Sequence, residues 1–284
     1  MNLNACSVAS LEAGETLAAT AVESVDRWLL LEVAEPWAPK ALQTEALPAT
    51  VRAKLGDWLG TPRSRLQLIR RPGRSGKRPL IMQVRSGADR QESSKLQLDQ
   101  YEDLLDVDLD ALPAEALAPI CLVCVHGRRD RCCALHGSSV FRAIQGQGVD
   151  TWQTSHLGGH RFAACAVWLP DGLMYGRLRA EHAPALVAAR QAGELGNIDL
   201  FRGRCAYDRP AQAAEIFLRR KLSAQDASAL ELIGSDSEDE STWVARFRTT
   251  SGETSVRVRL ESTGIDRPAS CGGEPEPVTR FVEL

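Results

Sequence analysis

The stretch ICLVCVHGRRDRCC, Ile120 to Cys133, decides the fold of the central part of this chain. Its first six residues are an apolar run, which predicts a buried strand over 120–125. A basic loop follows, and the sequence from about Cys133 to Gln145 is typical of a helix. A strand that leads through a short loop into a helix indicates an α/β unit.

The residues that follow complete this unit, which we place at 118–204. Asp171-Gly172 is a hairpin turn signal between two of its strands. Three strands and a helix are expected after the first helix, at 150–154, 161–169, 173–178 and 183–192. The resulting order, β-α-β-β-β-α with a hairpin before the last helix, is that of a thioredoxin-like fold.

Residues 1–117 form a predicted N-terminal α/β segment. Apolar runs predict three strands, at 27–33, 65–69 and 79–84, with a helical stretch near 40–59 between the first two. The basic, Pro/Gly-rich residues 70–78 are expected to form a solvated turn. The acidic residues 96–117 are interpreted as an excursion towards the next unit.

Residues 205–284 form a predicted C-terminal segment of helices and a hairpin. A helix is expected from Asp208 to about Lys221, and Ser223 can cap a second one. An acidic loop at 235–241 precedes a hairpin, whose strands are expected at 243–249 and 254–261. Two helices and a hairpin would suit a winged-helix DNA reader, but this segment has ten basic and fourteen acidic residues. That charge opposes phosphate binding.

Composition restricts the classes of function. The chain has 284 residues and a net charge of -3, which argues against nucleic-acid and anionic-membrane partners. It has no apolar run of membrane-spanning length, and its N-terminus lacks the pattern of a secretory signal. Four of the eight cysteines lie within thirteen residues. This favours a metal or redox site in a reducing, cytoplasmic setting over a disulfide framework.

Two cysteines and two histidines are the candidate ligands: Cys124, Cys133, His156 and His160. Two thiolates and two imidazoles complete a coordination shell for a transition metal. This donor set suits a closed zinc site, or a 2Fe–2S cluster with both histidines on one iron.

Neighbouring cysteines leave alternatives open. Cys121 and Cys124 lie three apart in a strand, so they point to opposite faces, and Cys121 is expected in the core. Cys132 and Cys133 are adjacent at a helix N-terminus, where thiolates are favoured. We favour Cys133 as the ligand, with Cys132 as the alternative.

The loop around the histidines also has an expected role. Leu157-Gly158-Gly159 separates them, so a tight loop is expected, with glycines that let the backbone approach a bulky cofactor. His126 is expected to support the site or to lie at the surface. The nearby arginines, Arg128, Arg129, Arg131 and Arg161, could stabilise thiolates or dock an acidic partner, and Asp130 could pair with one of them.

The cysteine loop, HLGGH and LPDGLMYGRL together resemble the sucrase/ferredoxin-like family. The resemblance is strongest over 120–178, and it extends to flanking motifs such as RWLLLEVAEPW and FRGRCAYDRPAQAAE. It implies a thioredoxin-like ferredoxin domain with a 2Fe–2S cluster held by Cys124, Cys133, His156 and His160.

This resemblance makes a one-electron carrier or redox sensor, working with a redox partner protein, the leading hypothesis. Electron transfer could be coupled to proton transfer through the histidines. We leave open whether the protein is an enzyme with a substrate of its own. The alternatives are a structural zinc protein with the same ligands and a thiol oxidoreductase that uses Cys132 or Cys133.

Overall fold

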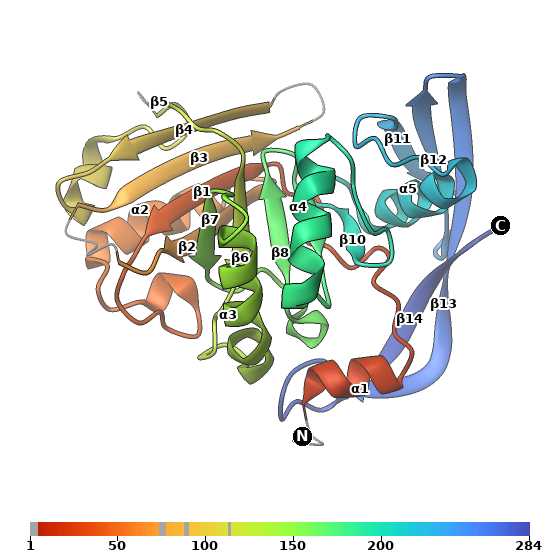
Figure 1. The fold of residues 1–284 in the computed structure, drawn as a ribbon, viewed down its shortest axis with the longest axis horizontal. Coiled ribbons are helices and arrows are strands. Elements are labelled where there is room, and N and C mark those ends of the chain that lie inside the picture. The colour runs from red at the N-terminus through yellow and green to blue at the C-terminus, as the bar shows by residue number, and fades with distance from the viewer. Residues whose placement is uncertain (1–4, 74–77, 88–90, 113–114) are drawn as a thin grey trace.

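The computed structural model describes residues 5–73, 78–87, 91–112 and 115–284. Within this part of the chain, one ten-stranded sheet runs β10-β9-β8-β6-β7-β2-β1-β3-β4-β5, and a separate four-stranded sheet runs β11-β12-β13-β14 (Figure 1). The chain is therefore a mixed α/β structure, as predicted. None of the described helices is both long enough and apolar enough to span a membrane.

The N-terminal part of the large sheet contains the three predicted strands and two that were not predicted. The strands are β1 (Arg27–Glu32), β2 (Ser64–Arg70), β3 (Leu80–Ser86), β4 (Gln91–Gln97) and β5 (Glu115–Ala116). β1 and β2 are parallel, which requires the helical crossover between them: η1 (Ala41–Gln43) and α2 (Ala49–Leu59). Residues 91–97, partly included in the acidic excursion, instead pair with β3. The centre of the predicted basic turn, 74–77, lies outside the described residues.

The central unit has the predicted order of elements. It consists of β6 (Ile120–Cys124), α3 (Arg131–Gln145), β7 (Thr151–Thr154), β8 (Ala166–Leu169), β9 (Leu173–Tyr175) and α4 (Ala183–Gln191), followed by β10 (Phe201–Arg204). The strand expected at 161–169 begins only at Ala166, because its first residues belong to a short 3-10 helix, η3 (His160–Phe162), and to the loop after it. Further short 3-10 helices are η2 (Tyr101–Asp106) and η4 (Ala180–His182).

The two faces of β6 pack into different cores. Cys121 is fully buried with Val140 and Phe141 of α3, whereas Cys124 packs on the opposite face with Trp152 and Phe162. The predicted core position of Cys121 is therefore confirmed.

β2 and β7 join the N-terminal segment to the central unit. Ile69 and Arg70 pair with Thr154 and Gln153, and Ser155 N–H donates to Leu68 O at 2.8 Å. The proposed boundary at 117/118 thus falls between two strands of one continuous sheet.

The C-terminal part, which the structure describes throughout, lacks the predicted second helix and has two strands that were not predicted, one of which, β11, covers the start of the predicted acidic loop at 235–241. It contains α5 (Arg209–Leu222) and four strands, β11 (Glu231–Ser237), β12 (Thr242–Thr249), β13 (Gly252–Pro268) and β14 (Pro275–Glu283). The predicted hairpin is the β12–β13 pair. Ser223 does not cap a second helix, because it ends α5 in a left-handed conformation, with φ of 52°. The buried Arg219 guanidinium donates to the carbonyls of Ala224, Asp226 and Ala227, which folds this segment back onto α5.

The N-terminal helix and the β13–β14 loop meet beside the central unit. The short helix α1 (Cys6–Glu12) packs against η3 and β13, and Figure 1 shows it at the end of the long β13 arm. The loop between β13 and β14 carries Cys271 to within 3.7 Å of Cys6, sulfur to sulfur. These terminal segments therefore reach the region of the predicted metal ligands.

Candidate metal centre

The central unit delivers the predicted ligands from four elements. Cys124 is the last residue of β6, and Cys133 lies in the first turn of α3. His156 follows β7, and His160 begins η3. Because β6 and β7 are parallel, Cys124 and His156 leave the sheet at the same end.

Cys124, Cys133 and His156 come together. One ligand atom from each lies within 4.8 Å of the other two, and Cys133 Sγ is 4.0 Å from His156 Nδ1. The two cysteines are only 1% and 2% exposed, whereas His156 is partly exposed. Two thiols and an imidazole at these distances can hold a transition-metal centre.

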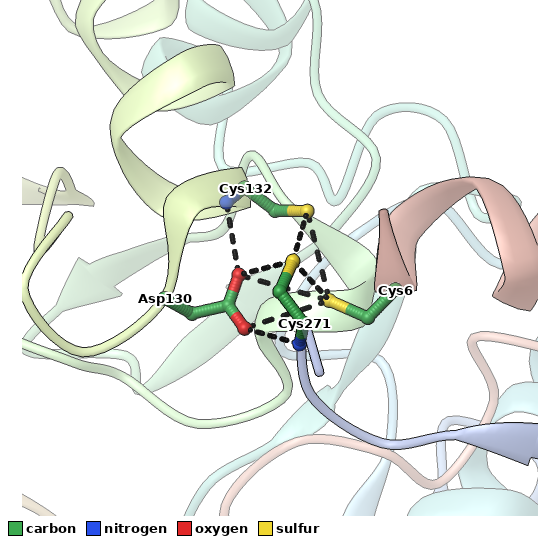
Figure 2. A group of neighbouring side chains, drawn as sticks. All are labelled: Cys6, Asp130, Cys132 and Cys271. Carbon is green, nitrogen blue, oxygen red and sulfur yellow. Dashed lines mark hydrogen bonds between the residues drawn. The ribbon is translucent and has the colours of Figure 1, made fainter. Parts of the chain in front are cut away.

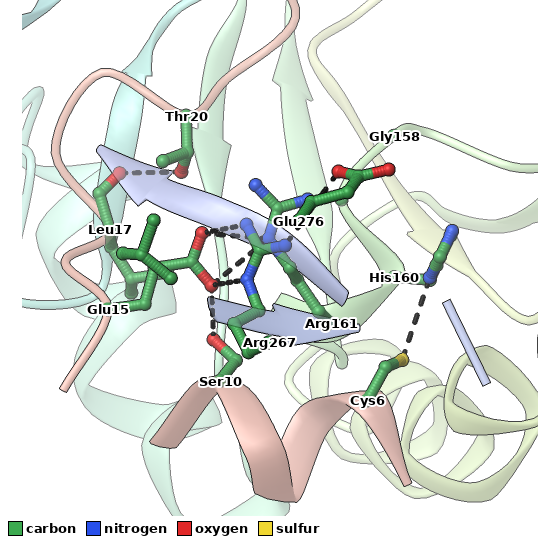
Figure 3. A network of polar contacts seen from close by, with 12 residues as sticks. Cys6, Ser10, Glu15, Leu17, Thr20, Gly158, His160, Arg161, Arg267 and Glu276 are labelled. Atoms are coloured by element: carbon green, nitrogen blue, oxygen red, sulfur yellow. Dashed lines mark hydrogen bonds and ion pairs between the residues drawn. The ribbon is translucent and has the colours of Figure 1, made fainter. Parts of the chain in front are cut away.

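His160 lies beside this group and also contacts a second one. Its ring centroid is 5.0 Å from that of His156. Its Nδ1 is 3.2 Å from Asp130 Oδ2 and 3.6 Å from Cys6 Sγ, a contact shown in Figure 3. Nε2 is therefore the atom left to bind a metal, and a ligand role for His160 stays a prediction.

The thiols of Cys124 and Cys133 have pKa values that are shifted in opposite directions. A hydrogen bond from the Cys133 thiol lowers the pKa of Cys124 well below its usual value, and the same interaction raises the pKa of Cys133. Burial lowers the pKa of His160 to about 4, although the charge of Asp130 opposes this shift. Thiolate and neutral imidazole are the forms that bind metals, so Cys124 and His160 favour the binding form, whereas Cys133 would release its proton as a metal binds.

Hydrogen bonds with His126 and two arginines fix the loop between His156 and His160. The buried His126 accepts from His156 N–H at its Nδ1, at 3.2 Å. Arg65 Nη2 donates to His156 O at 3.1 Å, and Arg202 Nη1 donates to Gly158 O at 2.9 Å. The sequence analysis missed both arginines because they lie far from the ligand motifs.

Both glycines of the loop have a positive φ, and Gly159 also lies against Arg202. Gly158 and Gly159 have φ of 100° and 67°. A Cβ on Gly159 would collide with the Arg202 guanidinium and lie 3.0 Å from Phe162 Cδ2. Close approach to the side chains of Arg202 and Phe162 therefore accounts for Gly159, and the approach to a cofactor stays a prediction.

The arginines singled out in the sequence take different positions. Arg128, Arg129 and Arg131 are exposed. Arg161 Nε donates to Glu15 Oε1 at 2.9 Å. Asp130 pairs with His160 and caps α3 by accepting from Cys132 N–H at 2.9 Å.

A second group of possible ligands lies next to the first. It consists of Cys6, Asp130, Cys132 and Cys271, one atom from each lying within 4.8 Å of the others (Figure 2). Cys132, the alternative ligand of the first site, therefore groups with Cys6 and Cys271 and not with Cys124. The sequence analysis missed this group because Cys6 and Cys271 are far apart in the chain.

Comparisons with known proteins give a family and three solved structures. The family model described as sucrase/ferredoxin-like matches residues 18–203. Two cysteine-to-serine variants of a thioredoxin-like [2Fe-2S] ferredoxin from Aquifex aeolicus are similar at 19% identity and a TM-score of 0.27, covering 30% of this chain and 97% of theirs. A further structure of a thioredoxin-like [2Fe-2S] ferredoxin from that organism has 22% identity and a TM-score of 0.23, covering 26% of this chain and 81% of its own. No curated protein matches.

Proposed function

Because this chain belongs to the sucrase/ferredoxin-like family, we propose that it holds a 2Fe–2S cluster and transfers or senses single electrons. The proposed ligands are Cys124, Cys133, His156 and His160. The observation that carries this proposal is the meeting of two buried thiols with His156, from three separate elements. Soft thiolate and imidazole donors suit iron in such a cluster.

The cluster would supply a one-electron couple. With two thiolates and two neutral imidazoles its formal charge is zero when oxidised and -1 when reduced. A four-thiolate cluster would go from -2 to -3, so the potential here is expected to be higher, in the manner of Rieske centres. Arg65 and Arg202, which bind the carbonyls of the histidine loop, add positive charge nearby and favour the reduced state.

Asp130 gives His160 a defined proton position. A proton on His160 Nδ1 is held by Asp130 Oδ2 at 3.2 Å, which orients Nε2 away from the carboxylate. Carboxylates in this relation to a ligand histidine raise its basicity. We therefore expect electron transfer to be coupled to a proton at His160 Nδ1.

A basic opening beside His156 is the proposed docking place for a redox partner protein. A cavity of about 360 Å³ is lined by Lys40, Arg65, Arg129, His126 and His156, among others. The cationic side chains in this wall favour an acidic partner surface. His156 is the partly exposed member of the three converging ligands, so electrons would enter at its ring.

The test is an absorption spectrum of the full chain purified without oxygen, with iron and acid-labile sulfide measured on the same sample. We expect a red-brown protein with about two irons and two sulfides per chain. Cys124→Ala should lose this colour, and His156→Cys should change the spectrum and lower the potential. Cys121→Ala is the matched control, because it removes a buried thiol from the opposite face of the same strand.

A colourless protein that carries one zinc at these residues, and that takes up no iron and sulfide on reconstitution, would overturn the proposal. That result would establish the structural zinc alternative. Equal loss of colour in Cys121→Ala and Cys124→Ala would remove the assignment of Cys124 as a ligand.

A further inference from the structure

We propose that Cys6, Cys132, Cys271 and Asp130 form a second metal site, which binds one Zn²⁺ and fastens α1 and the β13–β14 loop to α3. This site is distinct from the one proposed for the cluster. The adjacent residues Cys132 and Cys133 point in different directions from the first turn of α3. Cys133 packs with Cys124 in the core, whereas Cys132 packs with Cys6 and Cys271.

The three sulfur atoms form a nearly equilateral triangle. Cys6 and Cys132 are 3.6 Å apart, Cys132 and Cys271 are 3.4 Å apart, and Cys6 and Cys271 are 3.7 Å apart, all measured between Sγ atoms. Zinc binds thiolates at about 2.3 Å in a tetrahedron, which places the sulfurs about 3.8 Å from one another. The observed triangle therefore matches one face of a tetrahedral zinc site.

Asp130 occupies the position of the fourth ligand. Its Oδ1 lies 3.7 Å from Cys6 Sγ and 3.3 Å from Cys271 Sγ. A zinc-bound carboxylate oxygen at about 2.0 Å would lie about 3.5 Å from each bound sulfur. Figure 2 shows the carboxylate turned towards the sulfurs.

The carboxylate is held in this orientation by the same residues that supply two of the thiols. Cys132 N–H donates to Oδ1 and Cys271 N–H donates to Oδ2, each at 2.9 Å. Both bonds leave lone pairs free on the oxygens. A donor set whose members orient one another is typical of a preformed site.

The buried Asp130 carboxylate and the three buried or partly buried thiols favour a bound cation. Cys6 is 0% exposed, Cys132 is 1% exposed and the Asp130 side chain is 1% exposed. Among the described residues, His160 is the basic side chain that lies within ion-pair distance of Asp130. A buried carboxylate among three thiols is costly without a counter-charge. A divalent ion would supply this charge, and the thiols would release their protons to solvent as it binds.

Closed shells of three or four soft donors are typical of structural zinc. Here the donors come from α1, the start of α3 and the β13–β14 loop. The ion would therefore link segments that are 265 residues apart between Cys6 and Cys271. We expect its main effect on the stability of the terminal segments.

The experiment is zinc and iron analysis of the full chain, prepared without oxygen and washed with a weak chelator. Wild type should retain about one zinc per chain. Cys271→Ser and Cys6→Ala should each lower the zinc content at least tenfold, with the iron content unchanged. Cys205→Ala removes a buried thiol outside both groups, and it should retain the zinc.

Cobalt titration keeps the test valid if a variant folds poorly. Co²⁺ added to zinc-free wild type should give thiolate-to-metal charge-transfer bands that saturate at one equivalent, and Zn²⁺ should remove them. The same bands should persist in Cys124→Ala. If the protein holds no iron but shows this pattern, the cluster proposal fails and the zinc proposal stands.

Three results would overturn the zinc proposal. One is wild-type protein that neither retains zinc nor binds cobalt through thiolates. Another is zinc that is lost in Cys124→Ala and retained in Cys271→Ser. The third is a disulfide between two of these three cysteines in protein prepared without oxygen, detected by mass spectrometry of the blocked, denatured chain.

Discussion

Gly137→Ala is expected to destabilise the fold by about 3 kcal/mol and to empty the proposed cluster site. Gly137 is in the part of α3 that crosses β6, where the helix backbone lies directly on the strand. A Cβ at Gly137 would collide with the carbonyl oxygen of Cys124 and lie 3.1 Å from its carbonyl carbon. Backbone atoms cannot rotate aside, so α3 and β6 must separate. Cys124 and Cys133 would separate with them.

Urea unfolding of Gly137→Ala, together with its iron content, checks this expectation. Gly56→Ala is the matched control, because it also replaces a helical glycine and its Cβ would meet only Leu42 Cδ1, at 3.9 Å. The control should be neutral, or more stable by up to about 1 kcal/mol. A Gly137→Ala protein as stable as the control would show that the close approach of α3 to Cys124 is not required.

Glu15→Gln is expected to cost about 3 kcal/mol of folding free energy. Glu15 is buried and accepts from both Arg267 and Arg161 (Figure 3). The pair with Arg267 is bidentate: Nε donates to Glu15 Oε2 at 2.8 Å and Nη2 donates to Oε1 at 2.6 Å. Ser10 Oγ also donates to the carboxylate, at 2.9 Å. Glutamine keeps the shape but leaves two arginines facing a neutral amide.

Urea unfolding at neutral pH measures this loss. Glu261→Gln is the control, since its pair with Arg259 is 31% and 46% exposed. Exposed pairs of this kind contribute about 1 kcal/mol or less. If the two variants lose the same free energy of unfolding, burial does not make the ion pairs of Glu15 more stabilising than an exposed pair.

The effect of Glu15 should also depend on pH. Burial alone would raise the pKa of this carboxyl, but Arg267, Arg161 and Ser10 together hold it below its usual value of 4.5. Its contribution is therefore present above pH 4.5, where the unfolded carboxyl is also ionised, and it is lost as the pH falls through the folded pKa. The stability difference between wild type and Glu15→Gln should shrink over this acidic range.

Local pattern predicted the central unit well, because its strands are short apolar runs between clear turn signals. The thioredoxin-like order from β6 to α4 follows from such local features. The absent second helix could not be foreseen in this way. Ser223 has the chemistry of an N-cap, but tertiary hydrogen bonds from Arg219 fix the following segment in another form.

For the site, short motifs in the sequence predicted three of the side chains that come together. Cys124, Cys133 and His156 lie near one another in the chain and also in the structure. Cys6, Cys271 and Arg202 are far from these motifs in the sequence, and only the tertiary fold brings them to the same region. Pattern alone cannot bring such residues together, so the second group became visible only in the fold.

The pairing of β7 with β2 has a consequence for any attempt to isolate the central unit. Cut free at 118–204, β7 would keep β6 on one side but lose β2 on the other, where its amide and carbonyl groups would become unpaired. Unprotected edges of this kind recruit strands from other molecules. The excised fragment would be prone to self-association next to His156, so studies of cofactor loading need residues 1–117 in place.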